Sequence, residues 1–215
     1  MTLPHRLDFY NSPEGAVEYL EEYEKSHRKL SDKRERKLLA GYFQKMGELN
    51  RSLDLPCGWG RYLPYLQSQS KEVYQSDWSH DMLALGKERF GDESSAGRFR
   101  SLGNQLPLDS KSMDLCFSMR LNHHLVDPKV RRQHVQELFR VSNQWAIFSY
   151  FDKNSLKSWT RRVRKFFGGK KVLKNTLTRA EVHEIAVKSG FEIVADPMLF
   201  AIGSGHRLVL AKRQP

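Results

Sequence analysis

A short apolar segment that ends in an acidic residue and opens into a glycine turn constrains this chain more than any other feature. Leu53-Asp54-Leu55 is typical of the end of a buried strand, the turn Pro56-Cys57-Gly58-Trp59-Gly60 follows, and Arg61 stands at the expected start of a helix. Glycine lacks a Cβ, so Gly58 and Gly60 can adopt positive φ and let a ligand approach the main chain. The first N–H groups of the following helix can bind an anionic group. A single G-x-G nevertheless serves turn geometry as often as nucleotide binding.

A second acidic residue lies at the end of the next expected strand. The segment 73–76 leads into Asp77, roughly twenty positions past the glycines, where a carboxylate can accept both hydroxyls of a ribose. Asp77 or Ser79 could instead cap the helix that runs to Phe90, and the two roles can coexist. Leu63 stands where the dinucleotide fingerprint has a small residue, which argues against NAD.

Strands and helices alternate along the chain. Strands are expected near residues 50–55, 72–76, 97–101, 113–118, 143–150, 191–196 and 205–211, and helices near 13–28, 32–47, 60–68, 79–90, 128–141 and 178–189. This alternation predicts a largely parallel sheet that is covered by helices on both faces. Ligands of such sheets bind beyond the carboxyl ends of the strands, where Asp54, Asp77 and Met119 fall.

Several segments in order resemble the motifs of class I S-adenosylmethionine-dependent methyltransferases, in their small-molecule, methyltransferase type 11-like branch. Residues 53–60 resemble the first motif, 77–83 (Asp-Trp-Ser-His-Asp-Met-Leu) the second, and 106–115 (Leu-Pro-Leu-Asp-Ser-Lys-Ser-Met-Asp-Leu) the third. Residues 120–128 resemble the segment after the fourth strand, and 176–194 more loosely resemble a late helix–strand unit. Four ordered motifs at suitable spacing are far more specific than any one of them.

The resemblance implies a fold, a cofactor and a set of cofactor-binding residues. The fold is a Rossmann-like, doubly wound, mostly parallel seven-stranded sheet with helices on both faces and an antiparallel last strand. S-adenosyl-L-methionine is the implied cofactor. The residues implied to bind it are Asp54, Pro56, Cys57, Gly58, Gly60, Arg61, Asp77, Trp78, Met82, Gly103, Asn104 and Met119.

One position departs from the family pattern. The family usually has an acidic residue four positions before the Leu-Pro of its third motif, where it reaches the adenine amino group, and this chain has Leu102. Asn104, Gln105 or main-chain groups around Gly103 would then have to hold the adenine edge.

Methyl transfer from a sulfonium requires little chemistry from the protein. The cation already activates the methyl group, so the site mainly aligns the nucleophile for direct SN2 transfer and excludes water. Arg120, His123 and His124 stand nearest the expected methyl position, as catalytic candidates. Arginine beside a cation is unexpected unless it faces an anionic acceptor, and either histidine could be a general base or a packing residue.

Length and composition predict a single domain. The resemblance implies one methyltransferase domain over residues 1–215, with an N-terminal helical cap at 1–48 and a basic insertion at 151–176. N-terminal helices of the resembled family often cover the cofactor and substrate, so the resemblance implies that Tyr10, Tyr19 and Tyr23 are candidate pocket residues, with core packing as the alternative role. The sequence shows no apolar run long enough to span a membrane, no signal-peptide pattern and no zinc-ligand spacing. Its two cysteines are typical of a reducing compartment, so we expect a cytoplasmic protein without a metal site.

The basic insertion carries much of the charge. It holds nine Lys or Arg and one acid, a net +8 of the chain's +11. Its apolar residues repeat with helical spacing over 154–167, which predicts an amphipathic helix. That helix could pack its apolar stripe on the domain, or it could lie on the inner face of an anionic membrane or bind an acidic partner.

Three classes of function remain open from the sequence. The motifs favour an enzyme that methylates a small or amphipathic, anionic acceptor. A pI of 9.7 also suits an RNA methyltransferase that uses 151–176, although the sequence has no separate RNA-binding module and no Asn-Pro-Pro-Tyr-type motif. The third class is a non-catalytic module that binds S-adenosylmethionine. The sequence does not indicate an oligomeric state.

Overall fold

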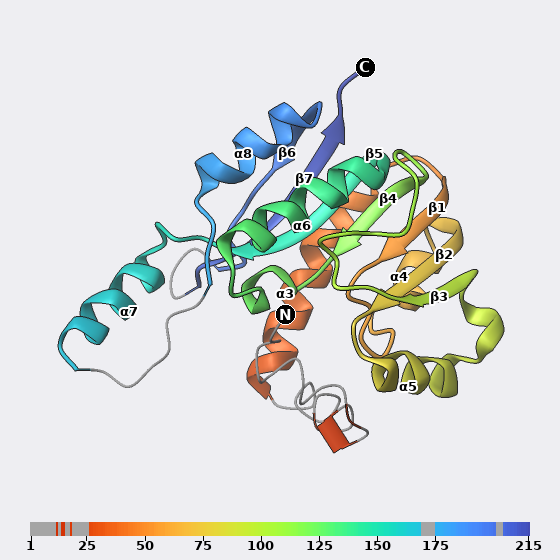
Figure 1. The fold of residues 1–215 in the computed structure, drawn as a ribbon, viewed down its shortest axis with the longest axis horizontal. Coiled ribbons are helices and arrows are strands. Elements are labelled where there is room, and N and C mark those ends of the chain that lie inside the picture. Colours follow the sequence, from red (N-terminus) through yellow and green to blue (C-terminus); the bar gives the residue numbers. More distant parts are fainter. Residues whose placement is uncertain (1–11, 13, 16–17, 19–25, 169–174, 201–203) are drawn as a thin grey trace.

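Seven strands form one twisted sheet in the computed structural model, which describes residues 12, 14–15, 18, 26–168, 175–200 and 204–215 (Figure 1). The strand order is β3-β2-β1-β4-β5-β7-β6. The first five strands pair in parallel, and β7 runs antiparallel to both β5 and β6. The strands are β1 Leu49–Asp54, β2 Ser70–Asp77, β3 Gly97–Arg100, β4 Met113–Ser118, β5 Ser142–Phe151, β6 Phe191–Ala195 and β7 His206–Arg213. The predicted doubly wound sheet with an antiparallel last strand is confirmed.

Helices cover both faces of this sheet, because the central strands are apolar on both sides. Along β4, Leu115 and Phe117 belong to the core that includes α3 and α4, whereas Cys116 belongs to the core that includes α6 and α8. Figure 1 shows α6 and α8 in front of the sheet. The helices are α3 Ser26–Phe43, α4 Leu63–Gln67, α5 His80–Phe90, α6 Pro128–Val141, α7 Leu156–Phe166 and α8 Arg179–Lys188, with short 3-10 turns at Asp92–Ser94 and Asn122–His124.

The N-terminal helices differ from the prediction. The expected break between residues 28 and 32 is absent, and α3 runs without interruption from Ser26 to Phe43. No proline or glycine stands at the expected break, and the buried side chains Leu39, Tyr42 and Phe43 lie at helical spacing against the sheet. The earlier helix expected over 13–28 lies mostly outside the described residues. Tyr10, Tyr19 and Tyr23 lie outside them as well.

The helix after the glycine turn is also shorter than predicted. It begins at Leu63 rather than near residue 60, and its five residues end at Gln67. The N–H groups of Gly60 and Leu63 already donate to main-chain carbonyls within the turn, to Cys57 O and Gly60 O. Fewer free N–H groups than expected are therefore available at the start of this helix. The main chain of the turn itself is the part that a ligand can approach.

The predicted helix in the basic insertion is present as α7, with Ser155 as its N-cap. Figure 1 shows α7 projecting away from the sheet. Its apolar stripe does not pack on the domain, since no residue of α7 is buried. Among the helices of the described residues, none has the length and hydropathy that a membrane span requires.

Candidate functional site

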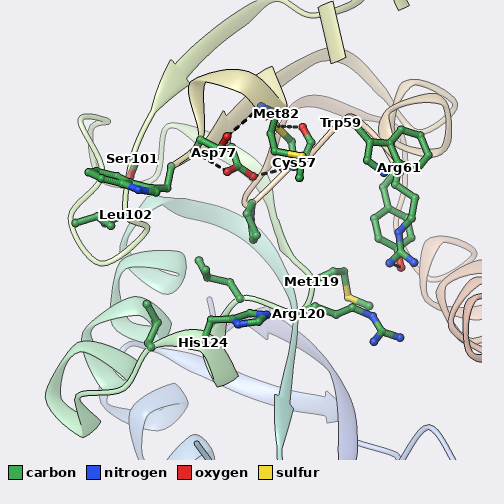
Figure 2. A pocket seen from close by; sticks show the side chains of 17 residues that line it. Cys57, Trp59, Arg61, Asp77, Met82, Ser101, Leu102, Met119, Arg120 and His124 are labelled. Carbon is green, nitrogen blue, oxygen red and sulfur yellow. Dashed lines mark hydrogen bonds between the residues drawn. The ribbon is translucent and has the colours of Figure 1, made fainter. Parts of the chain in front are cut away.

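A cavity of about 900 Å³, measured out to its mouth, lies beyond the carboxyl ends of β1, β2 and β4 (Figure 2). This is the edge at which parallel α/β sheets bind ligands. Figure 2 shows Asp77 and Cys57 on one side of the cavity, Met119, Arg120 and His124 on the other, and Ser101 with Leu102 at one end. The walls mix apolar and polar side chains: Pro56, Cys57, Gly58, Trp59, Arg61, Tyr62, Asp77, Trp78, Ser79, Met82, Ser101, Leu102, Met119, Arg120, Leu121, His124 and Leu125.

Asp77 fixes the glycine turn against the start of α5. One carboxylate oxygen accepts the N–H of Gly58 at 2.8 Å, and the other accepts the N–H of Ser79 at 2.9 Å. Ser79 is the N-cap, and its hydroxyl accepts the N–H of Met82. Burial raises the pKa of Asp77, and the main-chain donors oppose this rise. Main-chain N–H groups of Gly58, Ser79 and Trp78 use part of the roughly four acceptor sites of this carboxylate, and the remaining capacity is available to a hydroxyl donor in the cavity.

The two glycines of the turn have different tasks. Gly58 lines the cavity at φ 54°. Gly60, at φ 85°, does not line it; a Cβ at Gly60 would come within 3.0 Å of the Phe90 ring on α5. Gly60 therefore allows the turn to pack against α5.

Asp54 lies beneath the turn without reaching the cavity wall. Its side chain is almost fully buried, and neither carboxylate oxygen has a hydrogen-bond partner within the described part of the chain. Burial raises the pKa of Asp54 well above its ordinary value; nearby Arg61 opposes the rise and the Asp77 carboxylate adds to it. An unpaired buried carboxylate is costly, and a bound ammonium group or an ordered water would satisfy it.

The loop after β3 closes one end of the cavity with Ser101 and Leu102. Gly103 turns away from the cavity at φ 79°, where its N–H donates to the Ser101 hydroxyl and its carbonyl accepts from His134 Nδ1 at 2.8 Å. His134 Nε2 lies 3.0 Å from the Ser118 hydroxyl. Burial lowers the pKa of His134 to about 4, so the ring is neutral and acts as a structural tie between this loop, α6 and β4.

Arg120 has a strained main chain at the cavity wall. Its φ is 64°, in the left-handed region that non-glycine residues rarely adopt, and its N–H donates to the Ser149 hydroxyl at 2.8 Å. Such strain concentrates at functional sites. The Arg120 guanidinium donates to Glu35 of α3, so an acid of the protein itself faces this arginine.

Glu35 connects α3 to the cavity wall. It is fully buried, accepts hydrogen bonds from Arg61 at 3.2 Å and from the Tyr62 hydroxyl at 2.9 Å, and lies 3.7 Å from the His206 ring. Burial alone would raise its pKa, but the charges of Arg120, Arg61 and His206 together lower the pKa to about 2. Glu35 is therefore ionised, and it compensates part of the positive charge beside the cavity.

The two candidate histidines lie in the 3-10 turn after β4 and occupy different positions. His124 lines the cavity. His123 does not; its ring packs edge-on against Phe151 at 4.9 Å between centroids, and its carbonyl accepts the Asn175 side-chain N–H. The two imidazole rings contact each other at 4.1 Å between centroids.

The structure thus brings together most of the predicted site residues. Five predicted site residues lie outside the cavity wall: Asp54, Gly60, Gly103, Asn104 and His123. Of these, Gly103 bonds to His134 and Gly60 packs against Phe90. Seven wall residues were not among the predicted site residues: Trp59, Tyr62, Ser79, Ser101, Leu102, Leu121 and Leu125. Each of these seven follows the carboxyl end of a parallel strand, a signal that could have identified them.

Two further observations concern the chemistry of the site. Burial raises the pKa of the Cys57 thiol well above its ordinary value, and the nearby Asp77 and Asp54 charges add to the rise, so Cys57 is an unreactive wall residue. Over the described ranges, no group of three or more His, Cys, Asp or Glu side chains is placed to hold a metal ion.

Comparison with known proteins bears on the fold. Residues 53–148 match the family model of the methyltransferase domain, a span slightly under half of the chain that runs from the end of β1 into β5. No curated protein sequence matches the chain.

Solved structures share the fold at low sequence identity. A magnesium protoporphyrin IX methyltransferase from Synechocystis with bound S-adenosylhomocysteine is 17% identical, with 96% of this chain and 97% of that chain covered and a TM-score of 0.75. A methyltransferase from Clostridium acetobutylicum is 11% identical, with 93% and 99% covered and a TM-score of 0.68. A third, from Mesorhizobium loti, is 17% identical, with 84% and 98% covered and a TM-score of 0.63.

The sheet order and the cavity at its carboxyl edge give the Rossmann-like fold that these solved methyltransferases share. Within this fold, residues 53–148 are similar to a methyltransferase domain.

Proposed function

We propose that the cavity binds S-adenosylmethionine and directs its methyl group to a small or amphipathic acceptor. The observation that carries the proposal is Asp77, whose carboxylate fixes the Gly58 and Ser79 main chain and still faces the cavity with free acceptor sites. A ribose diol fits these sites, because each hydroxyl can donate to a carboxylate oxygen.

The remaining cofactor contacts follow from the shape of the cavity. The adenine would lie at the end formed by Ser101 and Leu102, where the Leu102 main chain makes no hydrogen bond to any described residue. Trp78 and Met82 supply apolar surface to the same wall. The unpaired Asp54 carboxyl, which lies behind the cavity wall, would reach the cofactor's amino group through a water.

Bound S-adenosylmethionine supplies an activated methyl group, and the protein's task is to position the acceptor. Met119, Arg120 and His124 form the wall opposite Asp77 and would face the acceptor (Figure 2). His124 could accept a proton from a nucleophile that arrives protonated. His123 would support His124 from behind, since it packs on Phe151.

The lining favours an acceptor with apolar surface. Tyr62, Met119, Leu121 and Leu125 contribute apolar surface near the three opposing side chains. The anionic character expected from Arg120 remains a prediction, because Glu35 already compensates part of that charge.

The proposal is tested in two steps. Calorimetry should show binding of S-adenosylmethionine and S-adenosylhomocysteine, whereas tight binding of NADH alone would refute it. Incubation with methyl-labelled cofactor and fractionated cell extract should place label in the lipid or polar-metabolite fraction. Label in RNA would favour the RNA methyltransferase alternative, and cofactor binding without turnover on any fraction would favour a non-catalytic module.

A further inference from the structure

Helix α7 presents an uncovered apolar face on the surface of the molecule. Leu156, Trp159, Phe166 and Phe167 are each more than half exposed, and they fall within one arc of the helix. Isolated exposed apolar residues are common, but aromatic residues gathered on one helix face indicate a contact surface.

The other side of α7 is basic. Arg161, Arg162, Arg164 and Lys165 lie on this side with Lys157, and the helix contains no acid. Arg161, Arg164 and Lys165 form no ion pair with any residue that the structure describes. Among the residues that the structure describes, the charges of Arg161, Arg164 and Lys165 are therefore uncompensated by an ion pair.

The first turn anchors the helix to the domain. The Ser155 and Ser158 hydroxyls both donate to the Asp152 carbonyl, at 2.8 and 2.7 Å. Asp152 is buried and also accepts from Arg207 Nε at 2.7 Å, which ties this point to β7. From this anchor α7 projects away from the sheet, so both of its faces remain accessible (Figure 1).

We infer that α7 is a docking surface for an anionic lipid membrane. A surface helix inserts its apolar face at the boundary between headgroups and acyl chains, while basic residues on its flanks contact anionic headgroups. A second copy of α7 would bring like charges together, and RNA would engage the basic side but leave the opposite apolar arc in water. An anionic bilayer satisfies both faces of the helix.

The position of α7 gives this docking a consequence for the site. β5 ends at Phe151, at the same edge of the sheet as the cavity, and α7 begins five residues later. Docking through α7 would bring that edge to the membrane, where an amphipathic acceptor would be concentrated. This consequence rests on the proposed function, whereas docking itself does not.

The experiment is co-sedimentation of the full chain with vesicles, in the absence of cofactor and acceptor. Vesicles of phosphatidylcholine with 30% phosphatidylserine should bind the protein at low salt, and binding should fall steeply in high salt. Each basic residue at an anionic surface strengthens binding roughly five-fold, so Arg161→Gln/Arg164→Gln/Lys165→Gln should weaken it roughly 100-fold. Trp159→Ala/Phe166→Ala should also weaken binding, and Trp159 fluorescence should shift to the blue on docking.

A charge-matched variant provides the control. Lys45→Gln/Lys71→Gln/Lys111→Gln removes three exposed charges at the amino edge of the sheet, two from loops and one from the start of β2, and should bind like the wild type. Equal binding to pure phosphatidylcholine, absence of binding to both vesicles, or equal loss in the two triple variants would overturn the inference. The inference would also be overturned if the α7 triple variant lost self-association or RNA binding while its vesicle binding stayed at the wild-type level. Because no cofactor is present, failure here leaves the methyltransferase proposal untouched.

Discussion

Replacing Asp77 with asparagine tests the cofactor site most directly. The substitution keeps the shape of the side chain but replaces one acceptor oxygen with a donor. In the structure both oxygens are used, one by the Gly58 N–H and one by the Ser79 N–H, so the new amide N–H₂ must face a donor on one side. It also cannot accept from a ribose hydroxyl on that side.

The expected loss follows from the count of unsatisfied groups. One buried hydroxyl left without an acceptor costs about 1–3 kcal/mol, which corresponds to roughly 10- to 100-fold weaker binding of S-adenosylmethionine. Stability should also fall by a similar amount, because one N–H of the turn loses its partner. Calorimetry must therefore be performed at a temperature at which thermal denaturation shows the variant to be fully folded.

Two controls separate a ribose contact from a displaced turn. Asp81→Asn removes a carboxylate from the first turn of α5, outside the cavity wall, and should leave the affinity for S-adenosylmethionine unchanged. The 2′-deoxy analogue of S-adenosylhomocysteine lacks one of the two hydroxyls, so Asp77→Asn should cost less with this ligand than with the parent ligand. Wild-type affinity in a folded Asp77→Asn protein would refute the assignment, and an equal loss with both ligands would attribute the effect to the turn.

Three further predictions concern α3, the turn and the histidines. Glu35→Gln removes the buried carboxylate that pairs with Arg61 and Arg120, and should lower the unfolding free energy by about 3–5 kcal/mol in urea denaturation at neutral pH. The pKa of Glu35 is lowered from 4.5 to about 2, so its contribution to the unfolding free energy is fully present above pH 4.5 and is lost as pH falls towards 2. The wild type should show this loss of stability, and the variant should not. Gly60→Ala and Gly168→Ala both place alanine at positive φ, but of these two only the Gly60 Cβ meets a neighbour within 4 Å. Gly60→Ala should therefore lower stability by about 1–2 kcal/mol more, and equal losses would contradict this packing role. If the nucleophile arrives protonated, His124→Asn should reduce the rate of S-adenosylhomocysteine formation roughly 10²- to 10⁴-fold, with nearly unchanged cofactor affinity. His123→Asn should reduce this rate less. A larger reduction in His123→Asn than in His124→Asn would exclude His124 as the base.

The class of the fold and the region of the site were predictable from the sequence for local reasons. An apolar strand that ends in an acid, glycines at the following turn and a second acid after the next strand each depend on a few neighbouring residues. Parallel strands align their carboxyl ends, so residues far apart in the chain could be assigned to one edge. Gly58, Asp77 and Met119 meet at one cavity for this reason.

The surroundings of individual side chains could not be predicted in the same way. Glu35 stands among charged residues of an amphipathic-looking helix, and the sequence gives no sign that it is fully buried between arginines from two other segments. Gly103 and Gly60 were expected to approach the cofactor, but their main chains serve contacts with His134 and Phe90. Such contacts depend on which elements pack together, and several packings suit the same local pattern.

The sequence by itself therefore determined the order of strands and helices, the glycine turn and the amphipathic character of 154–167, because these depend on short-range periodicity and backbone preference. The tertiary structure alone decided that Glu35 faces Arg120, that His124 rather than His123 lines the cavity, and that α7 exposes its apolar face. The physical reason is the same in each case: burial and charge compensation depend on the neighbours that folding brings from distant parts of the chain.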